Sequence, residues 1–286
     1  MSTLAAHPKP KILGHEPFDV RAVGARRDPE LIRRVLPFLE ALARYFRAEV
    51  VGVEHVPDEA PFLVVGNHSG GTLTPDMYIL LAAWFRQKGL DPPAYGLAHR
   101  GVFVVSPIRR FFEGLGAIGA SHENAERALD QGAVVLVYPG GDWEAFRPWW
   151  DRNKIDFGGN KGFVRLALRK GVPVLPAVSI GSHESLIVLS RGDRMARVLR
   201  LDRLVRLKVL PVSVSIPWGV LPGFLPGIPL PAKVTIQLCP PIDWRHLPSD
   251  AADDPTVIDQ CYEEVVSTMQ HTLNDLAARR RLPVLG

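Results

Sequence analysis

The chain has 286 residues, of which 47% are hydrophobic and 22% are charged, and its formal net charge is +4. These values are typical of a globular protein with a sizeable core, built as one large α/β domain or two small ones. Only two cysteines are present, Cys239 and Cys261, and no CxxC pair, which excludes a disulfide framework and a cysteine zinc site and favours the reducing cytoplasm.

The N-terminal part begins without the unbroken apolar core of a signal peptide, because prolines and charges interrupt it. We therefore interpret residues 1–28 as an N-terminal extension and residues 29–286 as a single domain. Residues 29–50 carry an apolar stripe at helical spacing that includes Phe38, with Pro37 interrupting it. This pattern predicts a first helix.

Five short runs rich in valine and isoleucine, each bounded by Gly or Pro, predict strands. They are residues 49–54, 62–66, 133–139, 173–181 and 233–238. Residues 121–132 and 160–171 predict helices that close at Gly132 and Gly171, and residues 255–281 predict a long C-terminal helix. The inward face of that last helix is predicted to consist of Ile258, Cys261, Val265, Met269, Leu273 and Leu276. Strands that alternate with helices predict an α/β fold with a central mixed sheet flanked by helices.

An Asn-His-Ser-Gly-Gly cluster at residues 67–71 leaves the carboxyl end of the run 62–66, where α/β sheets present their site residues. The cluster has the composition of a surface elbow. His68 is placed there as a general base, and Asp76, at the start of the next helix, is able to bond one imidazole nitrogen and leave the other free. The same spacing also fits a structural interpretation, in which His68 is a turn residue and Asp76 a helix cap.

A second buried strand ends at residues 139–141, and Asp142, Glu144 and Arg147 follow directly. Two strand ends, each with a double glycine and a charged tail, predict one shared pocket. The phosphate-loop and dinucleotide motifs are missing, and the residues 66–70 do not fit the nucleophile elbow of serine hydrolases. A histidine and a carboxylate without a paired nucleophile indicate a base that activates the hydroxyl of a bound substrate.

Two adjoining segments indicate a surface for lipids or phosphates. Residues 190–208 place an arginine at every third position among apolar residues, which predicts a basic amphipathic helix suited to anionic head groups or ligand phosphates, or alternatively a solvated helix face. Residues 209–232 have no charge but six prolines, which exclude a transmembrane helix and predict an apolar loop that is buried or dips into an interface. The predicted membrane- or phosphate-binding residues are Arg194, Arg197, Arg200, Arg203 and Arg206.

The chain resembles the glycerolipid acyltransferase family of lysophospholipid acyltransferase-like proteins, and within it the branch close to diacylglycerol acyltransferases. The resemblance covers roughly residues 45–245 and rests on the order and spacing of three stretches, "VVGNHSGG...PD", "GAIGASHENAERAL...G..VLVYPGGDWEA" and "KGFVRLALRKGVPVLPAVSIGSHE". It implies acyl transfer from an acyl thioester, commonly acyl-CoA, to a lipid hydroxyl at a membrane surface. No metal or further cofactor and no nucleic acid is expected.

Two departures from the family pattern bear on the site. The common form has the aspartate five positions after the histidine, whereas here His68 and Asp76 are eight apart, so either Asp76 or Glu144 is predicted to orient His68. The third motif has an acidic loop where phosphate-acceptor enzymes have Phe-Pro-Glu-Gly-Thr, which argues for a neutral alcohol. The predicted catalytic residues are His68, Asp76 and Glu144, and the predicted substrate-binding residues are Asn67, Gly70, Gly71, Tyr138, Pro139, Gly140, Gly141, Asp142 and Arg147.

The expected mechanism is direct transfer, with backbone amides near residues 70–71 or 140–141 stabilising the oxyanion. The expected partners are acyl-CoA or another acyl thioester, a lipid alcohol and an anionic membrane, with the protein at the inner face of that membrane. Residues 191–208 are expected to bind the phosphates of CoA or the membrane surface. Residues 209–232 are expected to line the binding site of the acyl chain. Two alternatives stay open, a lipid-binding or membrane-tethering module without turnover and a thioester or ester hydrolase.

Overall fold

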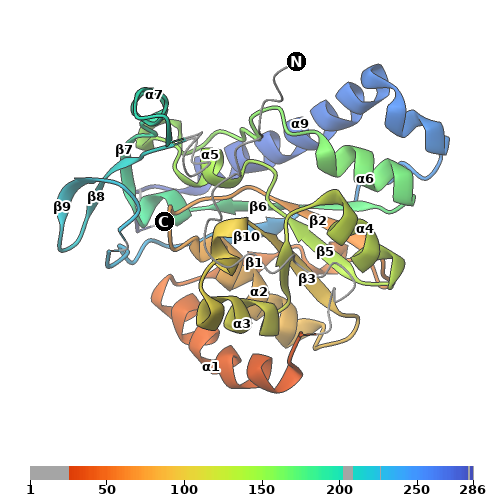
Figure 1. The fold of residues 1–286 in the computed structure, drawn as a ribbon, viewed down its shortest axis with the longest axis horizontal. Helices are drawn as coiled ribbons and strands as arrows, with labels where there is room; N and C mark the ends of the chain where they lie inside the picture. Colours follow the sequence, from red (N-terminus) through yellow and green to blue (C-terminus); the bar gives the residue numbers. More distant parts are fainter. Residues whose placement is uncertain (1–25, 202–208, 226, 283, 286) are drawn as a thin grey trace, which may run out of the picture.

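The computed structural model describes residues 26–201, 209–225, 227–282 and 284–285, and its centre is a seven-stranded sheet (Figure 1). The strands are β1 (Glu49–Val51), β2 (Phe62–Gly66), β3 (Ala94–Ala98), β4 (Ala117–Gly119), β5 (Val134–Val137), β6 (Val174–Ile180) and β10 (Thr235–Leu238), in the order β1-β10-β6-β2-β5-β3-β4. β6, β2, β5, β3 and β4 are parallel to one another, and β10 is antiparallel to β6. The predicted α/β fold with a mixed sheet is confirmed.

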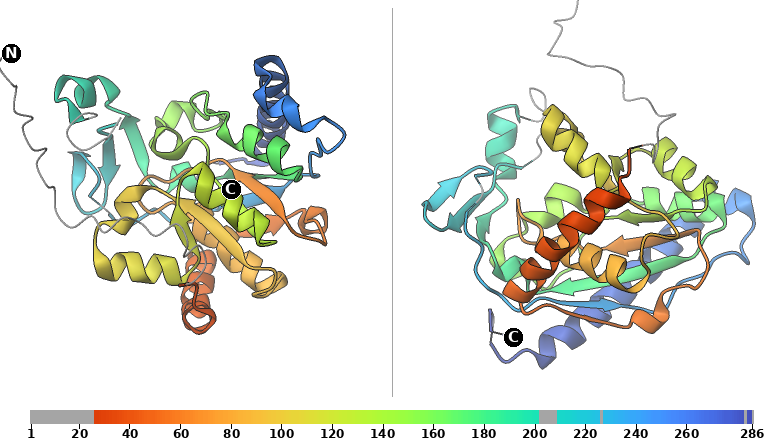
Figure 2. Two further views of the ribbon diagram at one scale, coloured as in Figure 1. Left: turned by 45° about the vertical axis from the view of Figure 1, so that its right-hand side comes forward. Right: turned by 90° about the horizontal axis from the view of Figure 1, so that it is seen from below.

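Helices cover both faces of this sheet, as the two turned views show (Figure 2). α1 (Pro29–Tyr45) and α2 (Pro75–Gln87) lie on one face, and α4 (His122–Asp130), α6 (Gly162–Lys170) and α9 (Pro255–Arg279) lie on the other. The shorter helices are α3 (Ser106–Gly114), α5 (Gly141–Ala145) and α7 (Asp193–Val198). The 3₁₀ turns are η2 (Val53–His55), η3 (Arg100–Phe103), η4 (Trp149–Asp151), η5 (Ser182–Glu184) and η6 (Ser249–Asp253).

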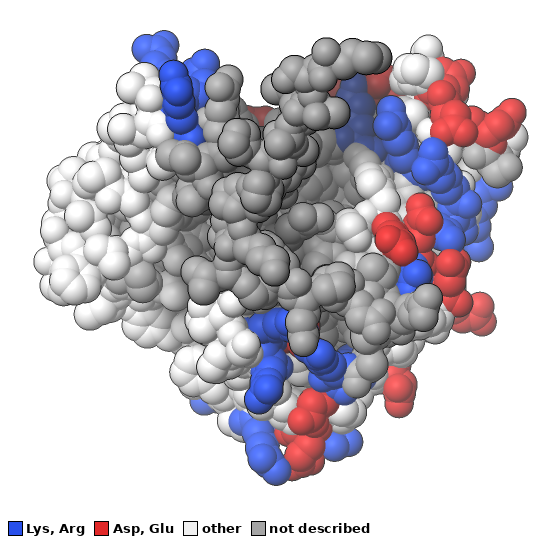
Figure 3. Space-filling model, in the orientation of Figure 1, with Lys and Arg blue, Asp and Glu red and all other residues white. Residues whose placement is uncertain are grey.

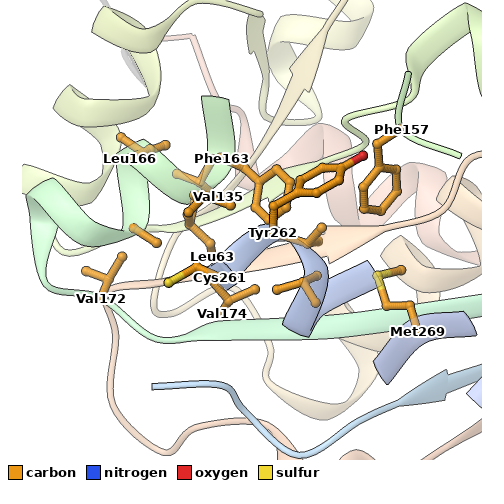
Figure 4. Close-up of a cluster of buried hydrophobic side chains, with 14 of the residues drawn as sticks. Leu63, Val135, Phe157, Phe163, Leu166, Val172, Val174, Cys261, Tyr262 and Met269 are labelled. Carbon is orange, nitrogen blue, oxygen red and sulfur yellow. The ribbon is translucent and has the colours of Figure 1, made fainter. Parts of the chain in front are cut away.

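Burial on both faces explains why the central strands are continuous apolar runs rather than alternating ones. All five residues of β2 and all seven of β6 are buried. The six residues predicted for the inward face of α9 are all buried, and that helix packs against α6 and the sheet. Figure 4 shows part of this core, where side chains of α9 meet those of β2, β5 and β6. The free thiols of Cys239 and Cys261 are buried.

Two details of α1 differ from the prediction. The helix continues through Pro37, and Phe38 is 68% exposed. The buried positions are Ile32 and Leu39, seven residues apart, followed by Phe46 at the same interval. A seven-residue interval keeps these side chains on one face of a helix, and Phe38 falls to the side of that face.

The segment after β6 forms a second, three-stranded antiparallel sheet, with β7 (Ile187–Ser190), β8 (Val212–Ser215) and β9 (Gly219–Pro222) in that order. The predicted apolar loop over residues 209–232 is therefore wrong, since β8 and β9 make a hairpin there. The predicted continuous helix over residues 190–208 is also wrong. α7 ends at Val198 and Arg200 has a φ of 52°, a left-handed conformation that a helix cannot continue through.

Within the described ranges no helix is long and apolar enough to cross a membrane. The same residues contain no group of three or more His, Cys, Asp or Glu side chains that could hold a metal ion.

Candidate active site

The carboxyl ends of three neighbouring strands bring the predicted site residues together. β2 lies between β5 and β6, and Val65 pairs with Val137 on one side and Pro176 on the other. The loop after β2 carries His68, the segment after β5 carries Tyr138 and Glu144, and η5 follows β6. In open α/β sheets this edge is where ligands bind.

His68 and Asp76 form a hydrogen-bonded pair, with Nδ1 and Oδ2 3.0 Å apart. Asp76 lies in the first turn of α2 and is 1% exposed, whereas the His68 side chain is 16% exposed. The eight-residue interval closes because the loop folds back through left-handed residues, namely Gly70 with a φ of 88°, Gly71 with 64° and Thr74 with 39°. Of the two predicted carboxylate partners, Asp76 is therefore the one that contacts the imidazole ring.

This pair sets the protonation of His68. Burial lowers the pKa of the imidazole, but the charge of Asp76 and the hydrogen bond with it outweigh burial, so the net pKa is raised above its ordinary value. In the neutral state the contact with Asp76 favours the proton on Nδ1. Nε2 then carries the lone pair, and it has no hydrogen-bond partner among the described residues.

Glu144 contacts the backbone of His68 instead of its ring. Its Oε2 accepts from the His68 amide at 2.9 Å, and its Oε1 accepts from Arg147 Nη2 at 2.6 Å and from the Asp156 amide at 3.3 Å. Burial raises the pKa of the Glu144 carboxyl, and Arg147 opposes this effect. Glu144 and Arg147 are both fully buried, so two of the three charged residues predicted to line the pocket are turned into the protein.

The elbow that carries His68 is buried, contrary to the predicted surface elbow. Asn67 is 1% exposed, and its side chain forms two hydrogen bonds with the backbone of Ser179 on β6, at 2.9 and 2.7 Å. A Cβ on Gly70 would lie 3.0 Å from the carbonyl oxygen of Ser182. Asn67 thus ties the end of β2 to β6, and the glycine lets η5 approach the loop.

The segment after β5 lies against the His68 loop. The Tyr138 ring stacks on the His68 ring with centroids 4.4 Å apart. The Gly141 amide donates to the Tyr138 carbonyl at 3.1 Å, and the Gly71 amide donates to the Ala145 carbonyl at 3.0 Å. The amides of Gly71 and Gly141 are therefore occupied, and of the four predicted oxyanion donors those of Gly70 and Gly140 have no hydrogen-bond partner among the described residues.

Two further predicted residues lie at the rim of this segment. The Pro139 carbonyl accepts from Asn160 at 2.8 Å. Asp142 is partly exposed in the first turn of α5, and its charge contributes to the raised pKa of His68.

His183 on η5 belongs to the same buried region and was not among the predicted residues. It is 5% exposed, and neither ring nitrogen has a hydrogen-bond partner among the described residues. Burial lowers its pKa well below the ordinary value, and the nearby charges of Arg147 and His68 add to this effect. The imidazole is thus neutral. Two signals in the sequence could have found it: His183 follows a predicted buried strand, and it lies in the third stretch on which the family resemblance rests.

The arginines of the segment after β7 divide into two groups. Arg191 turns inward, where its guanidinium lies 3.9 Å from the centre of the Trp143 ring and Nε donates to the Trp143 carbonyl. Arg194, Arg197 and Arg200 are exposed on and after α7, and Arg203 and Arg206 lie outside the described residues. Figure 3 shows Lys and Arg side chains over α7 at the upper left, beside a broad area over β8 and β9 without charged side chains.

A shallow cleft opens beside the His68 loop. Leu73 of the loop and Leu186, just before β7, line one side of it, and Leu225 and Ile228 line it from the segment that follows β9. The apolar hairpin region therefore begins at the edge of the site.

Comparison with known proteins relates this geometry to a family. The family model named Acyltransferase matches residues 47–180. An uncharacterised protein of Mycobacterium tuberculosis is 32% identical over 251 residues, which are 88% of this chain and 67% of that protein.

Two relatives carry names that describe an activity. The "DGAT1/2-independent enzyme synthesizing storage lipids" of Bos taurus is 30% identical over 151 residues, covering 53% of this chain and 43% of that protein. "Phytyl ester synthase 1, chloroplastic" of Arabidopsis thaliana is 26% identical over 250 residues, covering 81% of this chain and 34% of that protein. Among solved structures, the 1-acyl-sn-glycerophosphate (LPA) acyltransferase PlsC from Thermotoga maritima matches with a TM-score of 0.52 at 20% identity, over 88% of this chain and 83% of that one, which shows a shared fold.

Proposed function

Because the chain belongs to the glycerolipid acyltransferase family, we propose that it transfers a fatty acyl group from acyl-CoA to a lipid hydroxyl, with His68 as the general base. The observation that carries this proposal is the 3.0 Å contact between His68 Nδ1 and Asp76 Oδ2 at the carboxyl edge of the sheet. It leaves Nε2 as the basic atom of a side chain that is 16% exposed.

The proposed reaction needs no acyl-enzyme. His68 Nε2 takes the proton of the acceptor hydroxyl while the oxygen attacks the thioester carbonyl carbon. Asp76 stabilises the imidazolium that forms. The tetrahedral intermediate then expels the thiolate, which receives the proton from Nε2, so the products are an ester and free thiol. The Gly70 and Gly140 amides are the available backbone donors for the oxyanion.

The acceptor is proposed to be a lipid alcohol without a phosphate. Arg147 is buried and neutralised by Glu144, so it offers no cation to an acceptor phosphate, and Asp142 is the partly exposed charge of this segment. The names of two relatives, which refer to storage lipids and phytyl esters, support the same class of acceptor.

A membrane is proposed as the source of the acceptor, because the β8–β9 hairpin has an inverted pattern. On β8 the serines Ser213 and Ser215 are buried while Val214 between them is 37% exposed, and on β9 Val220 is 63% exposed. A sheet with one face in water places its polar residues outward, so an outward apolar face indicates an apolar partner. The exposed arginines of α7 next to it fit anionic head groups.

The test is an assay of the purified protein with labelled acyl-CoA, or with acyl carrier protein thioester as a second donor, and a panel of lipid alcohols. Transfer gives labelled ester, hydrolysis gives free fatty acid, and a binding module gives neither. Loss of a positioned base lowers turnover by about 10²–10⁴-fold. His68→Ala should therefore abolish most ester formation, with a melting temperature close to that of the wild type at pH 9, where His68 is neutral. Near-normal turnover of that variant would contradict the assignment of the base.

A further inference from the structure

Tyr138 and Gly66 are neighbours because of the register between two parallel strands. Val65 of β2 pairs with Val137 of β5, so the next residues along the two chains, Gly66 and Tyr138, also lie side by side. From there the phenol ring reaches the His68 imidazole, with centroids 4.4 Å apart and planes inclined by 30°. His68 is thus held at one edge by a carboxylate and on one face by an aromatic ring.

The Tyr138 ring also accounts for the glycine at position 66. Gly66 is the buried last residue of β2, and it is not among the residues with positive φ, so its backbone conformation does not require a glycine. A Cβ at this position would lie 2.5 Å from Cε1 and 3.0 Å from Cδ1 of Tyr138, and its three nearest atoms all belong to that ring. Glycine weakens a strand interior unless something approaches closely, and here the ring does.

We propose that Tyr138 is a positioning residue for His68: packed over Gly66, its ring is the platform that keeps the imidazole aligned with Asp76 and its Nε2 directed at the acceptor. This role rests on the proposed function of His68 as the base. The face of an aromatic ring attracts a cation, so the same contact favours the imidazolium formed during transfer. Neither effect needs the hydroxyl. Burial, together with the charges of Asp76 and Glu144, raises the pKa of the phenol well above its ordinary value, so it stays neutral.

Other ionisable groups act on the same imidazole and must stay constant in a test. They are Asp76 on α2, Asp142 and Glu144 on α5, and His183 on η5. Substitutions at positions 66 and 138 leave all four in place. A change in the pKa of His68 in such variants therefore reports the loss of the ring.

The experiment compares three substitutions with a matched control. Tyr138→Leu removes the ring, Tyr138→Phe keeps it, and Gly66→Ala displaces it without changing it. The control is Gly96→Ala, because Gly96 also lies in a parallel strand of this sheet without a positive φ, and a Cβ there would meet nothing within 4 Å. Kinetic constants are measured against pH, and the pKa of His68 is measured from its imidazole proton signals by NMR.

Misplacing a catalytic group by about 1 Å can lower turnover about 10²-fold. We therefore expect Tyr138→Leu and Gly66→Ala to lower kcat at least tenfold with KM nearly constant, and to lower the pKa of His68. Tyr138→Phe should retain most of the activity and the pKa, and Gly96→Ala should behave as wild type. An unchanged pKa and kcat in Tyr138→Leu would overturn the proposal.

A double variant keeps the proposal testable if Gly66→Ala folds poorly. In Gly66→Ala/Tyr138→Leu the added methyl no longer meets a ring, so this protein should fold and should lose no more activity than Tyr138→Leu alone. If the activity losses of the two single substitutions add up in the double variant, Gly66 does not act by making room for the Tyr138 ring, and the proposal is contradicted. If the wild type transfers no acyl group, the proposed function fails, and the NMR titration still decides whether the ring acts on His68.

Discussion

Glu144 and Arg147 form an ion pair that is sealed from water, with 2.6 Å between Oε1 and Nη2 and no exposed side-chain surface on either residue. Through its other oxygen Glu144 accepts a hydrogen bond from the backbone amide of His68. The pair therefore fixes the peptide that carries the imidazole, while Asp76 orients the ring.

Substituting one member of this pair should reduce the stability of the protein more than its catalytic activity. Leaving one charge of a buried pair alone costs about 3–5 kcal/mol, whereas replacing both members with apolar groups is often neutral. We expect Glu144→Gln to lower the free energy of unfolding by about that amount in urea denaturation, and Glu144→Gln/Arg147→Met to recover most of it. Equal destabilisation of the single and the double variant would show that the charges do not act as a pair.

Substituting Asp76 should lower catalysis more than stability, because its carboxylate contacts the ring of the proposed base. Asp76→Asn removes the charge that stabilises imidazolium and can favour the wrong tautomer, an effect that reaches about 10⁴-fold in serine proteases. We expect kcat to fall by about 10²–10⁴-fold, with a normal far-UV spectrum and melting temperature. Wild-type turnover in this variant would mean that His68 needs no carboxylate.

The activity should depend on pH through His68. The contact with Asp76 raises its pKa against the effect of burial, and the base is active only when neutral. The acidic limb of kcat/KM should therefore have its midpoint above the ordinary histidine value of about 6.5. In Asp76→Asn the midpoint should move to lower pH. An acidic limb of kcat/KM with its midpoint below about pH 6 in the wild type would contradict the raised pKa of His68.

Much of the scaffold could be predicted from local patterns. β2, β5, β6 and α9 have long apolar runs or a clear helical stripe, and burial on both faces of the sheet makes such runs reliable. β3 was missed because "AYGLA" at residues 94–98 has alanines and a glycine, which carry little strand signal. The hairpin was missed because prolines suggested a loop.

The site was predicted in part, because its motifs follow predicted strands. His68 and Asp76 could be paired from a carboxylate near a strand end, but the glycine-rich turn that closes the eight-residue interval depends on three left-handed residues. The burial of Glu144 against Arg147 was not predictable, because charged residues after a strand are usually solvated. His183 lies in the third stretch of the family resemblance, but its burial without hydrogen-bond partners is visible only in three dimensions.

Replacing His183 should affect stability in a direction that depends on pH. A histidine whose folded-state pKa is lowered is neutral in the native state but binds a proton in the unfolded state, so it destabilises the protein as pH falls below about 6.5. This slope can reach about 1.4 kcal/mol per pH unit. His183→Leu removes the slope and two buried nitrogens without partners, so the free energy of unfolding at pH 5.5 should rise relative to wild type.

His68 provides the opposite contribution, which serves as the internal control. Its raised folded-state pKa stabilises the protein fully below about pH 6.5, and this stabilisation is lost as pH rises through the folded-state value. His68→Ala should therefore lower stability at pH 5.5 and have little effect at pH 9. If His183→Leu is destabilising at every pH, His183 packs as a structural partner of its neighbours.

Binding to vesicles should require both the arginines of α7 and the apolar hairpin. Each basic residue near an anionic surface contributes about 1 kcal/mol, and the attraction is screened over about 10 Å at 0.1 M salt. We expect the protein to sediment with phosphatidylglycerol vesicles at low salt and to be partly released at high salt. Arg194→Glu/Arg197→Glu should weaken binding at least tenfold, and Val220→Asp should weaken it at all salt concentrations.

The matched control for the hairpin is Phe38→Asp, which places a charge at an equally exposed apolar position on α1. Phe38 is 68% exposed and Val220 is 63% exposed, and α1 lies at the bottom of the molecule whereas β9 lies at its left edge (Figure 1). If the hairpin enters the membrane interface, only the substitution in β9 should weaken sedimentation, because the proposed interface includes β9 and α7 but not α1. Equal losses for the two variants would indicate a non-specific effect of added negative charge. Equal binding of the wild type to phosphatidylcholine and phosphatidylglycerol vesicles at every salt concentration would refute the proposed electrostatic attraction between α7 and anionic lipids. The arginines of α7 would then be expected to bind the phosphates of the acyl donor.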